Sequence, residues 1–200
     1  MSDATHAAVV LAAGGSQRLG HAKQLLRRDG ETLVHRMVRL AASTRPQRLL
    51  LVTGAESQAI ADAAAGLGAE VLHNPDWAQG LASSLQRAAA ALSGFDGAVL
   101  LLGCDQPALD AHHLQALLRG AGTASSGCAA TVHGDAAGIP ALVTMALMQA
   151  STQLQGDRGL GARLTSMADA VWRMDAPELR LDIDHEDDVT AALALGLLDR

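Results

Sequence analysis

Aromatic side chains are nearly absent from this 200-residue chain. It contains one Phe, two Trp and no Tyr, although 49% of its residues are hydrophobic. A core built from such a sequence must be aliphatic, because little aromatic surface is available to bury. No apolar stretch reaches the roughly 20 residues that a helix needs to span a bilayer, and no basic-then-apolar leader opens the chain. We therefore expect a cytoplasmic protein that does not bind a membrane.

Cysteines are also few, and the chain has no net positive charge. Cys104 and Cys128 are the only cysteines and form no Cys-x-x-Cys pair, which argues against a disulfide scaffold or a zinc site. The formal net charge of −6 argues against the broad basic surface that nucleic acid requires. We therefore expect a protein that binds no nucleic acid and uses cations only locally. We also expect it to be a monomer.

Short apolar segments alternate with helical patterns along the chain. The expected strands are 7–12, 48–53, 69–72, 98–102, 128–132, 170–174 and 180–183. The expected helices are 32–43, 56–65, 81–92, 110–119, 144–153, 162–168 and 187–198. This alternation predicts a single-domain, Rossmann-like three-layer α/β sandwich with a mostly parallel sheet. We expect residues 1–6 to form a short polar tail and residues 7–200 to form the domain.

A glycine-rich segment follows the first expected strand. Residues 11–23 read Leu-Ala-Ala-Gly-Gly-Ser-Gln-Arg-Leu-Gly-His-Ala-Lys. Glycines let backbone N–H groups approach an anion, and Arg18 and Lys23 can neutralise it. The spacing fits neither a Walker A loop, since His21 and Ala22 follow the second glycine position, nor a dinucleotide fingerprint. From the glycines alone, a plain strand-to-helix connection with two solvated cations fits equally well.

Carboxylates follow two later segments. Ligands of parallel α/β sheets bind beyond the carboxyl ends of the strands, so the loops 13–23 and 103–107 should open onto one crevice. This places Lys23 near Asp105, whose oxygens are the ligands that Mg²⁺ prefers. Asp182 and Asp184 would face the same side of an extended segment and offer a second ligand. The alternative for Asp184 is a cap on the following helix.

Five segments carry a family resemblance. The pattern Leu-Ala-Ala-Gly-x-Ser-x-Arg-x-Gly-x-x-Lys resembles the signature loop of MobA-like nucleotidyltransferases, and within them the molybdenum cofactor cytidylyltransferases (MocA type). Further segments are similar to that family in the same order, namely 74–84, 103–107, 138–140 with 156–159, and 182–184. The usual Thr-Pro after the last motif is replaced by His185-Glu186. The resemblance implies a fold like that of nucleotide-diphospho-sugar transferases.

The resemblance implies an activity and its partners. The reaction would be Mg²⁺-dependent transfer of a nucleoside monophosphate, CMP from CTP, to the phosphate of molybdopterin with release of pyrophosphate. Leu11-Ala12-Ala13-Gly14 resembles the CTP-using branch, whereas GTP-using relatives tend toward Leu-Ala-Gly-Gly. Two alternatives are cytidylyl transfer to another small phosphorylated acceptor such as methylerythritol phosphate, and a non-catalytic nucleotide-binding chaperone of a molybdoenzyme. A molybdoenzyme or its maturation chaperone is a candidate protein partner.

The resemblance also implies roles for individual residues. Arg18 would hold the β- and γ-phosphates, Lys23 would neutralise the α-phosphoryl region, and Asp105 would ligate Mg²⁺ together with Asp184 or Asp182. The expected nucleotide-binding residues are Leu11, Ala12, Ala13, Gly14, Gly15, Ser16, Arg18, Lys23, Gly80, Ser83 and Ser84. The expected acceptor-binding residues are Asn74, Trp77, Asp157 and Arg158. Catalysis would be mostly positioning and electrostatics, because an acceptor phosphate is already an anion.

Overall fold

The computed structural model describes residues 5–200, which form an α/β sandwich around a seven-stranded sheet. The strand order is β5-β4-β1-β6-β8-β7-β9, and only β8 runs against its neighbours. The strands are β1 (His6–Ala12), β4 (Arg48–Thr53), β5 (Glu70–His73), β6 (Ala98–Leu102), β7 (Ala129–His133), β8 (Ala136–Thr144) and β9 (Trp172–Asp175). The expected single-domain fold with a mostly parallel sheet is confirmed.

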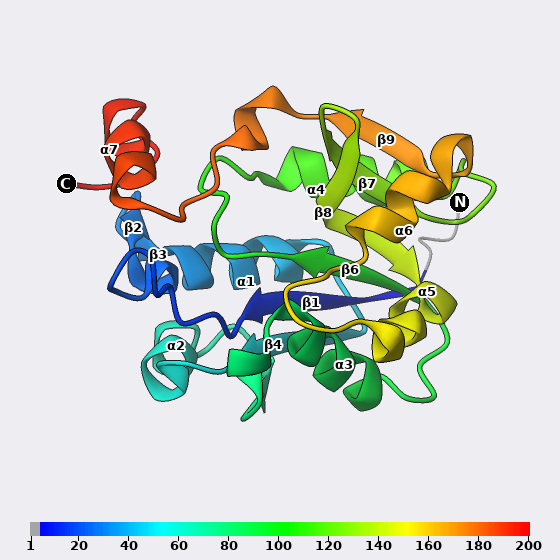
Figure 1. The fold of residues 1–200 in the computed structure, drawn as a ribbon, viewed down its shortest axis with the longest axis horizontal. Coiled ribbons are helices and arrows are strands. Elements are labelled where there is room, and N and C mark those ends of the chain that lie inside the picture. The colour runs from blue at the N-terminus through cyan, green and yellow to red at the C-terminus, as the bar shows by residue number, and fades with distance from the viewer. Residues whose placement is uncertain (1–4) are drawn as a thin grey trace.

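Helices cover both faces of the sheet (Figure 1). They are α1 (Leu33–Ser43), α2 (Ser57–Ala63), α3 (Leu81–Ala91), α4 (Ala111–Ala121), α5 (Met145–Gln149), α6 (Gly161–Ser166) and α7 (Glu186–Ala194). One aliphatic core lies between the sheet and α1, α2 and α4, and a second lies between the sheet and α3, α5 and α6. Val10 packs into the first core and its neighbour Val9 into the second. Burial on both faces explains why the central strands read as continuous apolar runs.

Side-chain caps fix where two helices begin. Thr32 accepts a hydrogen bond from the His35 N–H at the start of α1, and Asp110 accepts one from the His113 N–H at the start of α4. Threonine and aspartate are preferred at this position because they satisfy an N–H that the helix leaves free. The predicted starts at 32 and 110 are therefore the caps of these helices. Within residues 5–200, none of the helices is long and apolar enough to cross a membrane.

Strand β8 was not expected from the sequence. It contains Gly138 and Pro140, which disfavour a central strand because proline cannot donate to the ladder. The structure accommodates them at a register shift, where pairing with β7 jumps from Ala141 to Gly138. Thr131 donates its hydroxyl to the Pro140 carbonyl at 2.8 Å across this irregularity. The segment 138–140, which lies outside the expected strands, is therefore part of the longest strand of the described chain.

The segment 180–183 and the start of β1 also differ from the prediction. The segment 180–183 forms no strand, because a short 3₁₀ turn over Pro177–Arg180 leads directly into an irregular connection. At the other end, β1 already begins at His6, whose buried ring contacts the Thr44 hydroxyl at 2.9 Å. The predicted tail therefore does not include His6, and residues 1–4 lie outside the described residues.

A small third core attaches the C-terminal segment to the rest of the domain. Leu19, Leu33, Ile183, Ala192 and Leu198 form this cluster. Figure 1 shows α7, which carries Ala192, next to the hairpin of β2 (Arg27–Arg28) and β3 (Glu31–Thr32). The Asp199 carboxylate accepts hydrogen bonds from the N–H groups of Asp29 and Gly30 at the hairpin turn. These contacts bring α7 to the edge of the sheet where β1 ends.

Candidate active site

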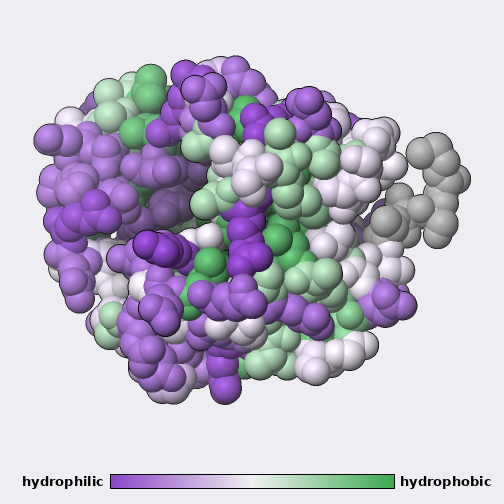
Figure 2. Space-filling view, turned by 45° about the vertical axis from the view of Figure 1, so that its right-hand side comes forward, coloured by the Kyte–Doolittle hydropathy of each residue, from purple (hydrophilic) through white to green (hydrophobic). Residues whose placement is uncertain are grey.

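A cavity of about 620 Å³ opens beyond the carboxyl ends of β1 and β6. Its walls come from the glycine-rich loop, from the segment that leads into α3, from the loop after β6, and from Asp157 and Asp184. Figure 2 shows a hollow with hydrophilic surroundings on the side of the molecule that carries α7. The cavity is therefore where parallel-sheet topology predicts a ligand.

Lys23 connects two carboxylates in this cavity. Its Nζ lies 3.0 Å from Asp105 Oδ2 and 2.8 Å from Asp184 Oδ1. The lysine follows β1, Asp105 follows β6, and Asp184 precedes α7, so three distant segments meet here. Burial lowers the pKa of Lys23, but the carboxylates of Asp105 and Asp184 outweigh it and raise that pKa above the usual value. The hydrogen bond from Lys23 lowers the pKa of Asp184.

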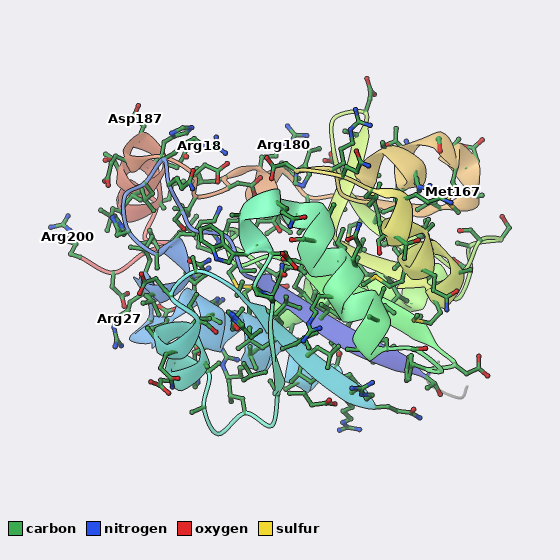
Figure 3. The ribbon with its side chains drawn as sticks, turned by 60° about the horizontal axis from the view of Figure 1, so that its bottom comes forward. Arg18, Arg27, Met167, Arg180, Asp187 and Arg200 are labelled. Atoms are coloured by element: carbon green, nitrogen blue, oxygen red, sulfur yellow. The ribbon has the colours of Figure 1, made fainter. Side chains whose placement is uncertain are left out.

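Arg18 lies at the outer edge of the same group. Its guanidinium is 3.7 Å from Asp184 Oδ2 and 3.3 Å from His185 Nε2, and its side chain is 66% exposed. Figure 3 shows Arg18 beside α7, the helix that carries Asp187. Both cations of the glycine-rich loop are thus held by Asp184, one tightly and one loosely.

Gln24 organises the glycine-rich loop, a role that sequence reasoning missed. The side chain is buried, and its Nε2 donates to the carbonyls of Ala12 at 3.1 Å and Gly14 at 2.8 Å. Ser16 donates its hydroxyl toward Gln24 Oε1 at 3.4 Å and accepts from the Lys23 N–H at 3.1 Å. The only sequence signal was its place next to Lys23, because burial of a polar side chain leaves no local pattern.

Trp77 packs against the loop and lines the cavity. A Cβ added at Gly15 would lie 2.7 Å from the indole, and one at Gly54 would lie 2.5 Å from the Trp77 Cβ. Both glycines therefore permit a close approach that any larger residue would block. The ring supports the backbone at Gly15 and presents part of its surface to the ligand space.

Asn74 does not line the cavity but contacts residues at the start of α3. It is buried, and its Nδ2 donates to Ser83 Oγ at 2.9 Å and to Ser84 Oγ at 3.0 Å. Its Oδ1 accepts the Asp76 N–H at 3.0 Å. Of these side chains, Ser84 reaches the cavity lining. Asn74 and Ser83 position the start of α3 instead.

A second loop covers the start of α3. Gly80 has φ of +98°, and a Cβ there would lie 2.4 Å from the carbonyl carbon of Gly156. The Gly156 oxygen accepts the Ala82 N–H at 3.0 Å. The first turn of α3 is therefore already partly capped by protein atoms. Asp157 lines the cavity beside Gly80, whereas Arg158 is exposed outside the lining.

Asp184 and Asp182 differ in their surroundings. The shared strand face expected for them does not exist, since the segment is irregular. Asp184 contacts Lys23, whereas Asp182 lies outside the cavity lining. Asp182 is an exposed residue, yet partial burial of its carboxyl group and the nearby charge of Asp105 raise its pKa to about 6. Asp184 is thus the residue that joins Asp105 at the cavity.

The donor set fits a hard divalent cation. Two carboxylate oxygens, from Asp105 and Asp184, converge within 3.0 Å of one point, the Lys23 Nζ. Among residues 5–200, no group of three or more His, Cys, Asp or Glu side chains could hold a metal. Mg²⁺ is commonly held by one or two carboxylates together with substrate phosphates and water, so this pair suits it. Cys104 also lines the cavity, but burial raises the pKa of its thiol and leaves it uncharged.

Known proteins share this architecture. The profile of the MobA-like NTP transferase domain matches residues 8–171. The bifunctional protein GlmU of Synechococcus sp. (strain CC9605) is 34% identical over 116 residues, which cover 56% of this chain. The chain spans only 25% of the length of that relative.

Solved structures extend the similarity over nearly the whole chain. Rv0371c from Mycobacterium tuberculosis H37Rv is 26% identical, with a TM-score of 0.80 over 95% of this chain and 98% of the other. The complex of Rv0371c with manganese aligns with a TM-score of 0.77 at 24% identity, over 95% of this chain and 98% of the other. The molybdopterin-guanine dinucleotide biosynthesis protein A from Archaeoglobus fulgidus shares the fold, with a TM-score of 0.66 at 19% identity over 94% and 97% of the two chains.

Proposed function

The chain belongs to the MobA-like NTP transferase family, and from this premise we propose that it transfers CMP from CTP to the phosphate of a molybdopterin-type acceptor and releases pyrophosphate. The observation that supports this proposal is the meeting of Lys23, Asp105 and Asp184 in the cavity behind the glycine-rich loop. Fixed cations and a carboxylate pair are what phosphoryl chemistry between two anions needs.

The proposed reaction needs little covalent chemistry from the protein. An oxygen of the acceptor phosphate forms a bond to the α-phosphorus of the nucleotide, and the bond between that phosphorus and the bridging oxygen breaks as pyrophosphate leaves. Because the attacking phosphate is already an anion, no general base has to activate it. The protein must instead bring the two anions together and hold them in line.

Each charged residue has a place in this scheme. The N–H groups of Gly14, Gly15 and Ser16 would face phosphate oxygens, with Arg18 and Lys23 neutralising their charge. Asp105 and Asp184 would hold Mg²⁺, which when bound supplies further charge neutralisation at the phosphates. Asp157 and Trp77, which line the same cavity, would border the acceptor.

The choice of CTP rests on the loop that begins the cavity. Leu11 and Ala13 line it, and Gln24 fixes the carbonyls of the neighbouring Ala12 and Gly14. A rigid site fitted to a pyrimidine edge rejects a base that leaves its buried polar groups unpaired. We therefore expect the preference for CTP over GTP to appear in kcat/KM.

A turnover assay tests the proposal. Pyrophosphate release is measured with CTP, GTP, ATP and UTP, each with a molybdopterin acceptor, with methylerythritol phosphate, and without acceptor. We expect turnover with CTP and molybdopterin. Faster turnover with GTP would overturn the cytidylyl assignment, and faster turnover with methylerythritol phosphate would overturn the acceptor. Nucleotide binding without any turnover would favour the chaperone alternative.

A further inference from the structure

The Lys23 ammonium lies where the two carboxylates of the cavity converge. Asp105 and Asp184 both direct an oxygen at it, at 3.0 and 2.8 Å. A divalent cation that took both oxygens as ligands would lie within a few ångströms of this ammonium. Two cations that close repel each other strongly in a partly buried site. Lysine and metal therefore compete for the same pair of carboxylates.

We propose that Lys23 is an internal counter-ion that closes the metal site, so that Asp105 and Asp184 accept a divalent cation once nucleotide phosphates have drawn the lysine away. The identity of that nucleotide rests on the proposed function, but the competition between Lys23 and the metal does not. The lysine would thus serve two ligands in turn, first the carboxylates and then the phosphates.

The closed arrangement is held in place on both sides. The Lys23 side chain is only 15% exposed, so its charge needs a partner, and removing both partners would be costly. The Lys23 N–H is anchored on Ser16 Oγ, and the Asp184 N–H on Asp188 Oδ2 at 3.0 Å. The ion pairs therefore join two preorganised backbone segments.

Nucleotide phosphates offer the lysine an equivalent partner nearby. Lys23 lines the same cavity as Gly14, Gly15 and Ser16, whose loop suits an anion. Arg18 also contacts Asp184, at 3.7 Å, and would turn toward the same anion. When Lys23 and Arg18 turn toward the phosphates, the carboxylate oxygens that they contacted become available to the metal. Because coupling between two ligands is reciprocal, the metal must strengthen nucleotide binding as much as the nucleotide strengthens metal binding.

Mn²⁺ binding without nucleotide tests the competition directly. The free Mn²⁺ signal is followed by electron paramagnetic resonance as the metal is added to the parent protein, to Lys23→Gln and to Arg87→Gln. Arg87 is an exposed cation on α3, so its replacement gives the same change in net charge away from the cavity. We expect Lys23→Gln to bind Mn²⁺ roughly tenfold more tightly than the parent, and Arg87→Gln to match the parent.

Two outcomes of this titration would overturn the proposal. Equal or weaker Mn²⁺ binding by Lys23→Gln would mean that the lysine does not close the site, and an equal gain in Arg87→Gln would assign the effect to net charge. Thermal unfolding provides a second measurement in case Lys23→Gln is unstable. Mn²⁺ should then raise the Tm of Lys23→Gln by more than it raises that of the parent, and an equal rise would contradict the proposal.

A nucleotide arm separates this inference from the proposed function. With CTP present, the parent should gain more Mn²⁺ affinity than Lys23→Gln does, after correction for Mn²⁺ bound to free CTP. If CTP has no effect on the parent but another nucleoside triphosphate does, the assignment of CTP fails while the lysine competition stands. If no triphosphate increases Mn²⁺ binding by the parent, the nucleotide-driven opening fails.

Discussion

Individual side chains in the cavity hold one another in place. Lys23 lies between Asp105 and Asp184, and its own backbone is fixed by Ser16, which in turn contacts Gln24. Each of these bonds satisfies a polar group that is at least partly removed from water, and leaving such a group unpaired is costly. Substitutions here should therefore separate into effects on charge and effects on loop shape.

Lys23→Ala should reduce turnover far more than it reduces stability. The loss of a fixed charge at the transferring phosphoryl group should cost ~2–4 kcal/mol of transition-state stabilisation, or about 30- to 900-fold in kcat/KM. Steady-state rates and a denaturant titration of parent, Lys23→Ala and the exposed control Arg87→Ala measure both quantities. Turnover within twofold of the parent would remove Lys23 from the catalytic group.

Gln24→Leu should distort the glycine-rich loop, although leucine has nearly the same volume as glutamine. The leucine would leave the carbonyls of Ala12 and Gly14 without their donor, a loss of ~1–3 kcal/mol in the free energy of unfolding. We expect a higher KM for the nucleotide and a smaller change in kcat, since the charges that act on the phosphates remain. Urea unfolding and initial rates measure this. A variant with unchanged stability and KM would show that the loop holds its shape without Gln24.

The functional residues of the cavity lie at the ends of individual strands and helices. β1 and β6 are neighbouring parallel strands, so the loops after both of them reach the same edge of the sheet. α3 begins directly after Gly80, under the loop that carries Asp157, and α1 begins beside the β2–β3 hairpin. Substitutions at the junctions between elements should therefore disturb the cavity as much as substitutions in the site itself.

Glu31 joins the hairpin to α1 and provides a pH test. Its carboxylate contacts Arg39 and Arg36, and hydrogen bonds from Arg39 first, then Arg36, lower its pKa below the unfolded value of 4.5. A lowered carboxyl pKa stabilises the fold above pH 4.5, and that contribution is lost as the pH falls through the folded pKa. Glu31→Gln should therefore be less stable at pH 7 by ~1–2 kcal/mol.

The difference between Glu31→Gln and its parent should shrink below about pH 4, because the parent then loses the same charge. Denaturant titrations between pH 3 and pH 8 measure it. Glu70→Gln is the matched control, since its carboxylate pairs with Arg48 at the exposed edge of the sheet and should contribute less. A pH-independent difference would mean that the charge of Glu31 is not what stabilises the hairpin.

The molecule as a whole closes the cavity by returning its C-terminal segment to the first loop. Asp184 and Lys23 are 161 positions apart, and Ile183 donates its N–H to the Asp105 carbonyl at 2.8 Å. The Ile183 side chain is fully buried in the small third core beneath α7. The same short segment thus anchors α7 and brings Asp184 to the cavity.

Ile183→Ala tests this connection. A cavity at a buried isoleucine should cost ~2–5 kcal/mol of stability, and looser docking of α7 should also weaken Mn²⁺ and nucleotide binding. Leu164→Ala is the control, because Leu164 is buried in the core between the sheet and α6. We expect similar losses of Tm but weaker ligand binding for Ile183→Ala only. Equal ligand affinities in the two folded variants would contradict the coupling.

The sequence by itself determined the layered fold and the proximity of Lys23 to Asp105. Apolar runs marked the strands 48–53 and 98–102 to the residue, because buried parallel strands need both faces apolar. Once the order of strands implied a parallel sheet, the meeting of Lys23 with Asp105 followed from topology. Glycines and cations next to a strand end likewise predict that the glycine-rich loop binds an anion, and this stays a prediction.

The tertiary structure alone decided the rest. Asp184 contacts Lys23, whereas Asp182 does not line the cavity. The chain after Arg180 is irregular, so the alternation of side chains along a strand, which predicted the same direction for both aspartates, does not apply. The tertiary structure also buried Gln24 under the loop and built β8 around Pro140. These features depend on contacts between segments far apart in the chain. Local patterns report which face of an element is buried, but they do not report which distant group will satisfy a polar atom there.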